Sequence, residues 1–252
     1  MPYPFLDHPG PIPLAHRGGA LEGLENTMVA FESATRLGYR YLETDARVTE
    51  DGRLVAFHDD HLGRTCDRPG RISRLPWSEV QAARVGGKEP IPLMEDVLGT
   101  FPEARINLDA KSDAAVAGLI DVVRRTNSVR RVCIGAFSGR RLRQIRAALG
   151  PEVCTAMGPV EVGRWVAGSF LRGGWGIPAL PVAQVPVKQT GVPVVSARSV
   201  RAAELLGIQV HVWTVDDPAE MERLLDLGVH GIITDRPQVL KDVLQRRGQW
   251  FE

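Results

Sequence analysis

The sequence predicts an α/β fold, a (β/α)8 TIM barrel with a small insertion after the second strand, and two observations lead to this class. Apolar strand-like runs alternate with helical patterns about eight times along the 252 residues, and repeated βα units form a parallel sheet with helices outside. Polar residues follow several of the strand runs, and the strand ends of a barrel are where its site lies. An open doubly wound sheet is the alternative, but it would carry a glycine-rich phosphate loop after its first strand, which residues 16–19 do not match.

The composition fits one domain spanning residues 1–252 and excludes some partners. Hydrophobic residues make up 44% of the chain, and 31 basic residues nearly balance 30 acidic ones. Without a long basic run, neither nucleic acid nor an anionic membrane is an expected partner. No signal peptide or membrane-spanning stretch is expected either. Three widely spaced cysteines without metal-ligand spacing indicate a reduced, cytoplasmic protein. Nothing in the sequence indicates an oligomeric state.

The first βα unit is expected to carry part of a site. Residues 1–11 are rich in proline and are expected to form an extended lead-in. The strand run at residues 12–15 ends in His16 and Arg17 and breaks at two glycines. Helical spacing follows over residues 25–37, with Asn26 as its expected N-cap.

The chain is organised around residues 41–59, which predict two strands joined by a turn at Asp51-Gly52. Side chains alternate faces along a strand, so Glu43 and Asp45 point the same way. Two adjacent carboxylates repel each other, and folds neutralise such a pair with a cation or a shared proton. The second strand delivers His58 to the same region.

The remaining segments complete the alternation. Residues 60–92 are rich in glycine and proline and are interpreted as the insertion, packed over one end of the barrel, with an ordinary long loop as the alternative. The expected helices after it cover residues 93–101, 114–125, 140–149, 160–171, 200–206, 218–227 and 237–246. The expected strands cover residues 105–110, 131–137, 152–157, 179–185, 209–215 and 231–234, with residues 194–195 extended.

Several strand ends together carry acids, histidines and basic residues: His16, Arg17, Glu43, Asp45, His58, Asp109, Lys111, Trp213 and Asp235. Oxygen ligands favour a hard divalent cation such as Mg²⁺ or Ca²⁺. Arginine and lysine favour a phosphate, and two histidines favour acid–base work near neutral pH. The set indicates metal-assisted cleavage of a phosphoester. Individually, Asp235 is expected to cap the following helix, Trp213 to be either core or site, and His211 to be a core histidine.

Seven short motifs occur in order with matching spacing: His-Arg-Gly (16–18), Glu-Asn-Thr (25–27), Glu-Thr-Asp (43–45), Thr-Glu-Asp-Gly (49–52), His-Asp (58–59), Trp-Thr-Val (213–215) and Gly-Ile-Ile-Thr-Asp-Arg-Pro (231–237). As an ordered set they resemble the glycerophosphodiester phosphodiesterase family over residues 12–237. The resemblance implies hydrolysis of a small-molecule glycerophosphodiester to sn-glycerol 3-phosphate and an alcohol.

The resemblance also implies roles. Glu43, Asp45 and Asp109 would bind the divalent cation, Mg²⁺ or Ca²⁺. His16 and His58 would be the catalytic acid–base pair. Arg17 and Lys111 would hold the phosphate, and Trp213 would lie beside the glycerol.

Two positions depart from the family pattern. Asp109 stands where glutamate is common, and Asp216 where asparagine is common. Asp216 would add a negative charge if it faced the pocket, or would cap a helix. We expect the leaving alcohol to extend toward the insertion, whose charged residues lean basic.

Two other functions stay open at this point. A phospholipase D or C on the same barrel would act on intact lipids and would be expected to show an apolar membrane-facing loop. A non-catalytic barrel would only bind phosphorylated ligands, and the presence of both His16 and His58 argues against it.

Overall fold

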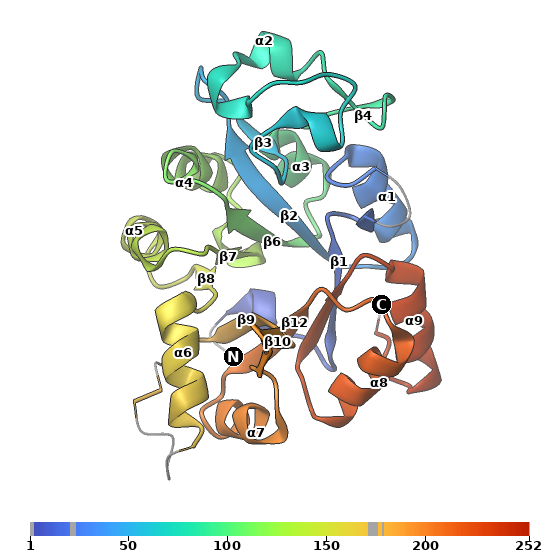
Figure 1. The fold of residues 1–252 in the computed structure, drawn as a ribbon, viewed down its shortest axis with the longest axis vertical. Coiled ribbons are helices and arrows are strands. Elements are labelled where there is room, and N and C mark those ends of the chain that lie inside the picture. Colours follow the sequence, from blue (N-terminus) through green and yellow to red (C-terminus); the bar gives the residue numbers. More distant parts are fainter. Residues whose placement is uncertain (1–2, 21–23, 171–175, 178, 252) are drawn as a thin grey trace.

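The computed structural model describes residues 3–20, 24–170, 176–177 and 179–251, and within them the predicted barrel is confirmed (Figure 1). Its eight parallel strands follow the spatial order β8-β7-β6-β2-β1-β13-β12-β9. A parallel bridge between Ala156 and Val182 joins the two ends of this series and closes the barrel. The barrel strands are β1 (Ile12–His16), β2 (Tyr41–Val48), β6 (Arg105–Ala110), β7 (Val132–Gly135), β8 (Cys154–Thr155), β9 (Val182–Pro186), β12 (Gln209–Trp213) and β13 (Gly231–Thr234).

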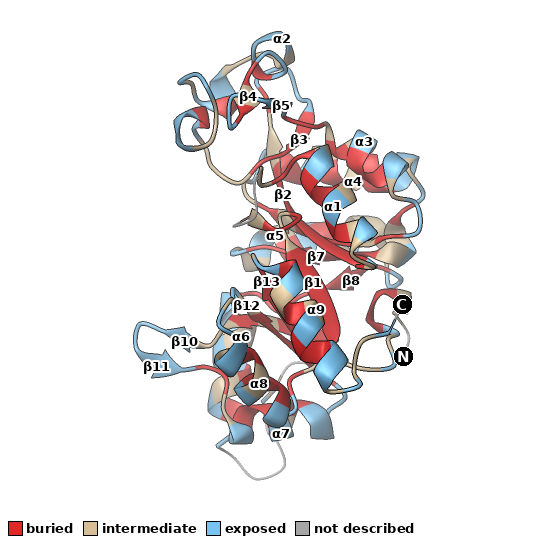
Figure 2. Cartoon of the chain, turned by 90° about the vertical axis from the view of Figure 1, so that its right-hand side faces the viewer, coloured by how far each residue is buried: buried red, intermediate tan, exposed pale blue. Residues whose placement is uncertain are grey.

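Helices surround these strands with their apolar sides turned inward. In Figure 2 the strands are almost wholly buried, whereas the helices show exposed outer faces. The surrounding helices are α1 (Met28–Arg36), α3 (Met94–Thr100), α4 (Ala115–Arg125), α5 (Gly139–Leu149), α6 (Pro159–Gly168), α7 (Ala197–Leu205), α8 (Pro218–Asp226) and α9 (Pro237–Arg246). No helix in the described ranges is long and apolar enough to span a membrane.

The predicted second strand of the central unit is β3 (Leu54–Ala56), which pairs antiparallel with β2. After it comes the insertion, built from the short helix α2 (Trp77–Val80), single turns of 3-10 helix and the small hairpin of β4 (Arg84–Val85) and β5 (Glu89–Pro90). Its apolar side chains form a small core together with Val55 and Phe57. The insertion therefore projects from the β2–β3 end of the barrel (Figure 1).

Three local expectations differ from the structure. Residues 4–6 form a turn of 3-10 helix whose Phe5 and Leu6 are buried against the barrel strands, so this lead-in is not simply extended. The N-cap of α1 is Thr27, whose hydroxyl accepts from the Ala30 amide, and not Asn26. Between β9 and α7 the chain forms a hairpin of β10 (Lys188–Gln189) and β11 (Val192–Pro193) that the sequence did not predict. Residues 1–2 of the expected lead-in and residue 171 of the expected helix over residues 160–171 lie outside the described residues.

Candidate active site at the strand ends

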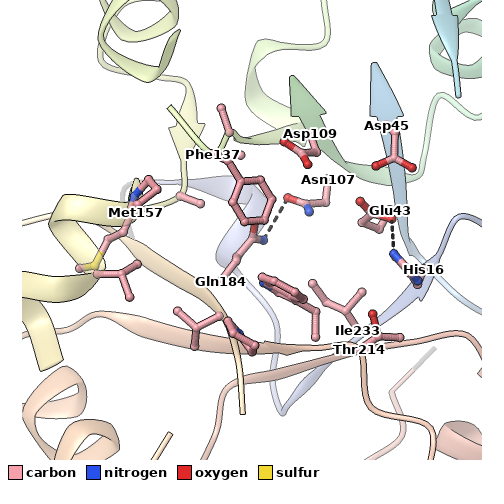
Figure 3. A pocket seen from close by; sticks show the side chains of 18 of the residues that line it. His16, Glu43, Asp45, Asn107, Asp109, Phe137, Met157, Gln184, Thr214 and Ile233 are labelled. Carbon is pink, nitrogen blue, oxygen red and sulfur yellow. Dashed lines mark hydrogen bonds and ion pairs between the residues drawn. The ribbon is translucent and has the colours of Figure 1, made fainter. Parts of the chain in front are cut away.

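A cavity of about 400 Å³ opens at the carboxyl ends of the barrel strands (Figure 3). All eight predicted site residues line it: His16, Arg17, Glu43, Asp45, His58, Asp109, Lys111 and Trp213. They come from five different strands or the turns after them, and such gathering at strand ends is typical of a barrel site. Their placement is therefore as expected, while their individual roles remain predictions.

Strand register explains why the acids lie on the same side of the sheet. His16 of β1 pairs with Glu43 of β2, and Asp45 of β2 pairs with Asp109 of β6. Side chains two residues apart on β2 share a face, so the register brings all four groups to the same side of the sheet. Glu43 is only 6% exposed and Asp45 only 1%. Burial and the neighbouring Asp45 carboxylate raise the pKa of Glu43 to about 7.

His16 is held between two carboxylates. Its Nδ1 lies 2.5 Å from Oδ1 of Asp235, and its Nε2 lies 3.7 Å from Oε2 of Glu43. Burial lowers the pKa of His16, but Glu43 and then Asp235 outweigh burial and leave the pKa above its usual value. The helix-capping role expected for Asp235 is wrong, because the N-cap of α9 is Arg236 and the Asp235 carboxylate binds His16 instead.

His58 has a similar arrangement on the other side of the cavity. Its Nδ1 lies 2.5 Å from Oδ1 of Asp59, the next residue in the chain. Burial lowers the pKa of His58 below its usual value and outweighs the opposing effects of Asp45 and Asp59. Because a carboxylate accepts, Nδ1 donates in both histidines, which leaves Nε2 of each as the nitrogen that can accept or give a proton to a ligand.

Arg17 has a strained backbone with φ of 52°, a left-handed conformation that costs a non-glycine residue of order 1–3 kcal/mol. Its amide donates to Glu43, its Nη1 donates to Glu25 at 2.9 Å, and its Nε lies 3.2 Å from Asp45. Asn26, also left-handed at φ 57°, is buried and donates from Nδ2 to Asp45. A strained backbone conformation persists where surrounding contacts stabilise it. Here the stabilising partners include Glu43 and Asp45, which line the cavity.

Lys111 lies between two of the predicted metal ligands. Its Nζ is 2.8 Å from Oδ1 of Asp45 and 2.6 Å from Oδ2 of Asp109. The other carboxylate oxygen of Asp109 is buried and has no hydrogen-bond partner. Burial, opposed by Lys111, raises the pKa of Asp109. A buried, unpartnered carboxylate oxygen is costly unless a ligand completes it.

The carboxylate oxygens of the cavity are ligands of the type and charge that suit a hard divalent cation. Three carboxylates, Glu43, Asp45 and Asp109, line the cavity with two cations, Arg17 and Lys111, and oxygen donors are those that Mg²⁺ and Ca²⁺ prefer. Within the described ranges, however, no three acidic, histidine or cysteine side chains converge as a metal cluster would. The unpartnered oxygen of Asp109 is the observation that favours a cation here.

The departure at Asp216 has a structural role that the sequence did not indicate. Its Oδ1 accepts from the Thr234 hydroxyl at 2.9 Å and from the Asp235 amide at 2.8 Å. Asp216 is not among the residues that line the cavity, and the N-cap of α8 is the next residue, Asp217. Oδ1 of Asp216 therefore supports the end of β13 through these two hydrogen bonds, and the carboxylate does not line the cavity.

One half of the cavity is lined mainly by apolar side chains, and among these the sequence predicted only Trp213. Figure 3 shows Phe137 and Met157 on the side opposite His16 and Glu43. Trp213 lines the cavity, and Phe137 packs edge-on against it with ring centroids 5.9 Å apart. The other apolar lining residues are Ala136, Ala156, Pro159, Val162, Val185, Pro186, Val194 and Ile233. Phe137 is the last residue of the strand expected at residues 131–137, and this strand-end position was the signal that pointed to it.

No described residue of the insertion at 60–92 lines the cavity. The expectation that a leaving alcohol extends toward the insertion therefore loses its basis. Asn107 and Gln184, both missed by the sequence analysis, instead lie on the cavity wall and are joined by a hydrogen bond of 3.0 Å (Figure 3). His211 is fully buried and bound to Gln209, so it is the core histidine that the sequence predicted.

A model of the glycerophosphoryl diester phosphodiesterase family matches residues 16–239. The chain is 40% identical over 251 residues to probable glycerophosphodiester phosphodiesterase 2 of Mycobacterium tuberculosis, covering 98% of this chain and 95% of that protein. It is 28% identical over 272 residues to lysophospholipase D GDPD1 of Homo sapiens, covering 92% and 85%.

Solved structures share the fold. A phosphodiesterase of Oleispira antarctica, solved with the product sn-glycerol-3-phosphate, superposes with a TM-score of 0.78 at 21% identity, covering 93% of this chain and 97% of that one. The structure of a protein of Silicibacter pomeroyi named "putative glycerophosphoryl diester phosphodiesterase" superposes with a TM-score of 0.80 at 22% identity and covers 98% of both chains.

Proposed function

Because the chain belongs to the glycerophosphoryl diester phosphodiesterase family, we propose that it hydrolyses glycerophosphodiesters to sn-glycerol 3-phosphate and an alcohol, with His16 and His58 as the acid–base pair. The observation that carries this proposal is the paired arrangement of the two imidazoles. Each is bound at Nδ1 by a carboxylate and lines a cavity that also holds Arg17 and Lys111.

The proposed reaction is a displacement at phosphorus with balanced proton transfers. One imidazole Nε2 takes the proton of the attacking oxygen as the new P–O bond forms. The bond from phosphorus to the leaving alcohol breaks, and the other imidazole gives that oxygen a proton. The attacking oxygen is that of water or of the neighbouring glycerol hydroxyl. In the second route the displacement gives a cyclic phosphate, and water then attacks phosphorus and breaks a ring P–O bond to give sn-glycerol 3-phosphate. General acid–base catalysis contributes about 10²–10⁴-fold.

Charge on the phosphoryl group is the second requirement of the reaction. Arg17 and Lys111 lie in the same wall as the carboxylates, and cations placed there offset negative charge that grows in the transition state. Glu43, Asp45 and Asp109 would hold the divalent cation, which supplies further charge stabilisation when bound. The unpartnered Asp109 oxygen supports this assignment.

Product analysis on glycerophosphocholine tests the proposal. We expect release of sn-glycerol 3-phosphate and choline, and a loss of about 10²–10⁴-fold in kcat for His16→Ala and for His58→Ala. The matched control is His61→Ala, an exposed histidine near the same region that does not line the cavity, and it should keep full activity. Release of phosphocholine, or unchanged turnover in either pocket variant, would contradict the proposed chemistry.

The apolar half of the cavity favours a second candidate, cleavage of glycerophosphodiesters that carry one acyl chain. If the glycerol lies beside Trp213, an acyl chain on that glycerol would continue along Phe137 and Met157. Burying apolar chain against apolar wall gains about 25 cal/mol per Å². The similarity to a human protein named lysophospholipase D agrees with this direction.

A matched pair of phenylalanines tests the second candidate. Phe137 and Phe170 are each 67% exposed, but only Phe137 lines the cavity. We expect Phe137→Ser to lower kcat/KM for lysophosphatidylcholine while leaving that for glycerophosphocholine nearly unchanged, and Phe170→Ser to affect neither. If wild type does not cleave lysophosphatidylcholine, or if both variants respond alike, the apolar half does not bind an acyl chain.

A further inference from the structure

Within the insertion, Arg64 is the last residue of a 3-10 turn over residues 62–64. Its guanidinium binds two carboxylates at once. Nη2 and Nη1 donate to the two oxygens of Glu25 at 2.6 and 2.8 Å, and Nε donates to Asp59 at 2.5 Å. A fourth contact joins Nη2 to the other oxygen of Asp59 at 3.2 Å. The planar fork of arginine suits such paired recognition.

Each of these carboxylates also holds a residue of the active site. Glu25 Oε1, which Arg64 binds, also accepts from Nη1 of Arg17 at 2.9 Å. Asp59 Oδ1, which Arg64 also contacts, binds Nδ1 of His58 at 2.5 Å. Arg64 therefore shares one carboxylate, Glu25, with the expected phosphate-binding Arg17. It shares another, Asp59, with His58 of the acid–base pair.

The backbone that carries Arg64 is well supported. Leu62, in the same turn, is fully buried in the core of the insertion. The carbonyl of Thr65, the next residue, accepts from the Gly86 amide at 2.7 Å. Leu24, directly before Glu25, packs against the same small core. The segment that carries Glu25 and the turn that carries Arg64 are therefore also in contact through apolar packing.

We propose that Arg64 is a positioning residue, which fixes Arg17 and His58 relative to each other by holding Glu25 and Asp59 from the insertion. The inference rests on the proposed function, because it requires that His58 transfers a proton and that Arg17 binds the phosphate. It assigns to the insertion a role in supporting the catalytic geometry instead of contacting the leaving group.

The expected effect of removing Arg64 on kcat and KM follows from its two partners, Asp59 and Glu25. Displacement of catalytic groups by about 1 Å costs of order 10²-fold in rate. Loss of the hydrogen bonds from Arg64 to Asp59 would let His58 change orientation and would lower kcat. Loss of the hydrogen bonds to Glu25 would let Arg17 move, which weakens phosphate binding and raises KM. Arg64 itself is 49% exposed, so the fold should lose little stability when the side chain is removed.

A second arginine of the insertion provides the matched control. Arg71 is 44% exposed and binds Asp60 at 2.6 Å, but neither residue lines the cavity. With glycerophosphocholine as substrate, we expect Arg64→Ala to lower kcat/KM by about 10–100-fold, through both parameters, and Arg71→Ala to leave both within about twofold. Arg64→Lys should recover part of the loss, because it keeps the charge but not the fork.

The pairing with Asp59 provides a second measurement. If Arg64 acts on kcat through Asp59, the loss in Arg64→Ala should be non-additive with that of Asp59→Asn, since the two residues form one network. Equal kcat and KM in Arg64→Ala and Arg71→Ala, with wild type active, would overturn the positioning role and leave the proposed function standing. A wild-type protein that releases no sn-glycerol 3-phosphate would instead overturn the proposed function.

Discussion

Nδ1 of His16 donates a hydrogen bond of 2.5 Å to Oδ1 of Asp235, which joins the end of β1 to the residue after β13. The two strands are neighbours in the barrel, although 219 positions separate the residues in sequence. The contact fixes the orientation of the imidazole and leaves its Nε2 facing Glu43. An ordered histidine–carboxylate pair of this kind is a common support for proton transfer.

We therefore predict that Asp235→Asn lowers kcat by about 10²-fold. The amide can present either its oxygen or its NH₂ to Nδ1, so the tautomer and orientation of His16 are no longer fixed. KM should change little, because Asp235 does not line the cavity. Steady-state kinetics on glycerophosphocholine provide the measurement.

Asp217→Asn is the control for this prediction. Asp217 caps α8 through its Oδ1, and asparagine caps a helix about as well as aspartate, so this variant should retain wild-type kinetics and melting temperature. Normal kcat in Asp235→Asn would show that His16 does not need the carboxylate and would weaken the case for His16 as an acid or base.

Part of this site could be predicted from sequence because strand geometry is regular. Alternation placed Glu43 and Asp45 on one face, and the barrel topology brought Asp109 beside them. The partner of His16 could not be predicted in the same way. A strand-end aspartate before Pro237 has the sequence signature of a helix cap, and only the path of the backbone after Thr234 shows that Asp235 turns toward β1.

The apolar half and the role of Arg64 escaped prediction for a related reason. Phe137 and Met157 stand in loops after strands, where sequence does not determine the direction of a side chain, and apolar residues there also suit a core. Arg64 lies in a segment without clear periodicity, and its two partners come from different loops. Contacts of this type depend on loop conformation rather than on strand or helix repeats.

A cation requirement is the second prediction. We expect chelation to remove activity and Mg²⁺ or Ca²⁺ to restore it better than Zn²⁺, because the expected ligands are all carboxylates. Mg²⁺ should also raise the melting temperature of the wild-type protein, since a ligand that binds only the folded state stabilises it by about 2.7 kcal/mol at 100 times its Kd.

Substitutions at Asp109 separate ligation from other roles. Asp109→Glu keeps the carboxylate and should retain more activity and more of the Mg²⁺-dependent stabilisation than Asp109→Ala. Equal loss of both readouts in the two variants would argue against ligation by this residue, and full activity after exhaustive chelation would rule out the cation altogether.

The third prediction concerns stability at acid pH and rests on His211. Burial lowers the pKa of His211 from 6.5 to about 3. Between these values the unfolded chain binds a proton that the folded chain does not, so this residue makes the free energy of unfolding fall as pH falls from about 6.5 to about 3. The slope is at most about 1.4 kcal/mol per pH unit.

Denaturant unfolding at pH 7 and pH 5 measures this contribution. We expect His211→Gln to be less stable than wild type at pH 7 but to lose about 2 kcal/mol less between the two pH values. The exposed histidine variant His61→Gln should keep the wild-type difference. If His211→Gln shows the full wild-type loss on acidification, the buried imidazole does not become protonated on unfolding in this range.

The last prediction compares two glycines with left-handed backbones, Gly18 at φ 81° and Gly52 at φ 83°. A Cβ on Gly18 would lie 2.8 Å from both the carbonyl carbon and the Cβ of Ala30, inside α1, whereas a Cβ on Gly52 would meet nothing within 4 Å. Alanine should therefore cost about 1–2 kcal/mol at Gly52, from backbone strain alone, and about 1–3 kcal/mol more at Gly18, from overlap with the helix.

The difference should also appear in activity, because a shift of α1 away from Gly18 would move the segment that carries Asn26, whose amide holds Asp45. Gly18→Ala should lower kcat/KM, and Gly52→Ala should leave it near wild type, when both are assayed well below their melting temperatures. Equal destabilisation in the two variants would mean that α1 moves without cost. Equal activity despite a larger loss of stability at Gly18 would mean that Asp45 does not depend on this contact for its position.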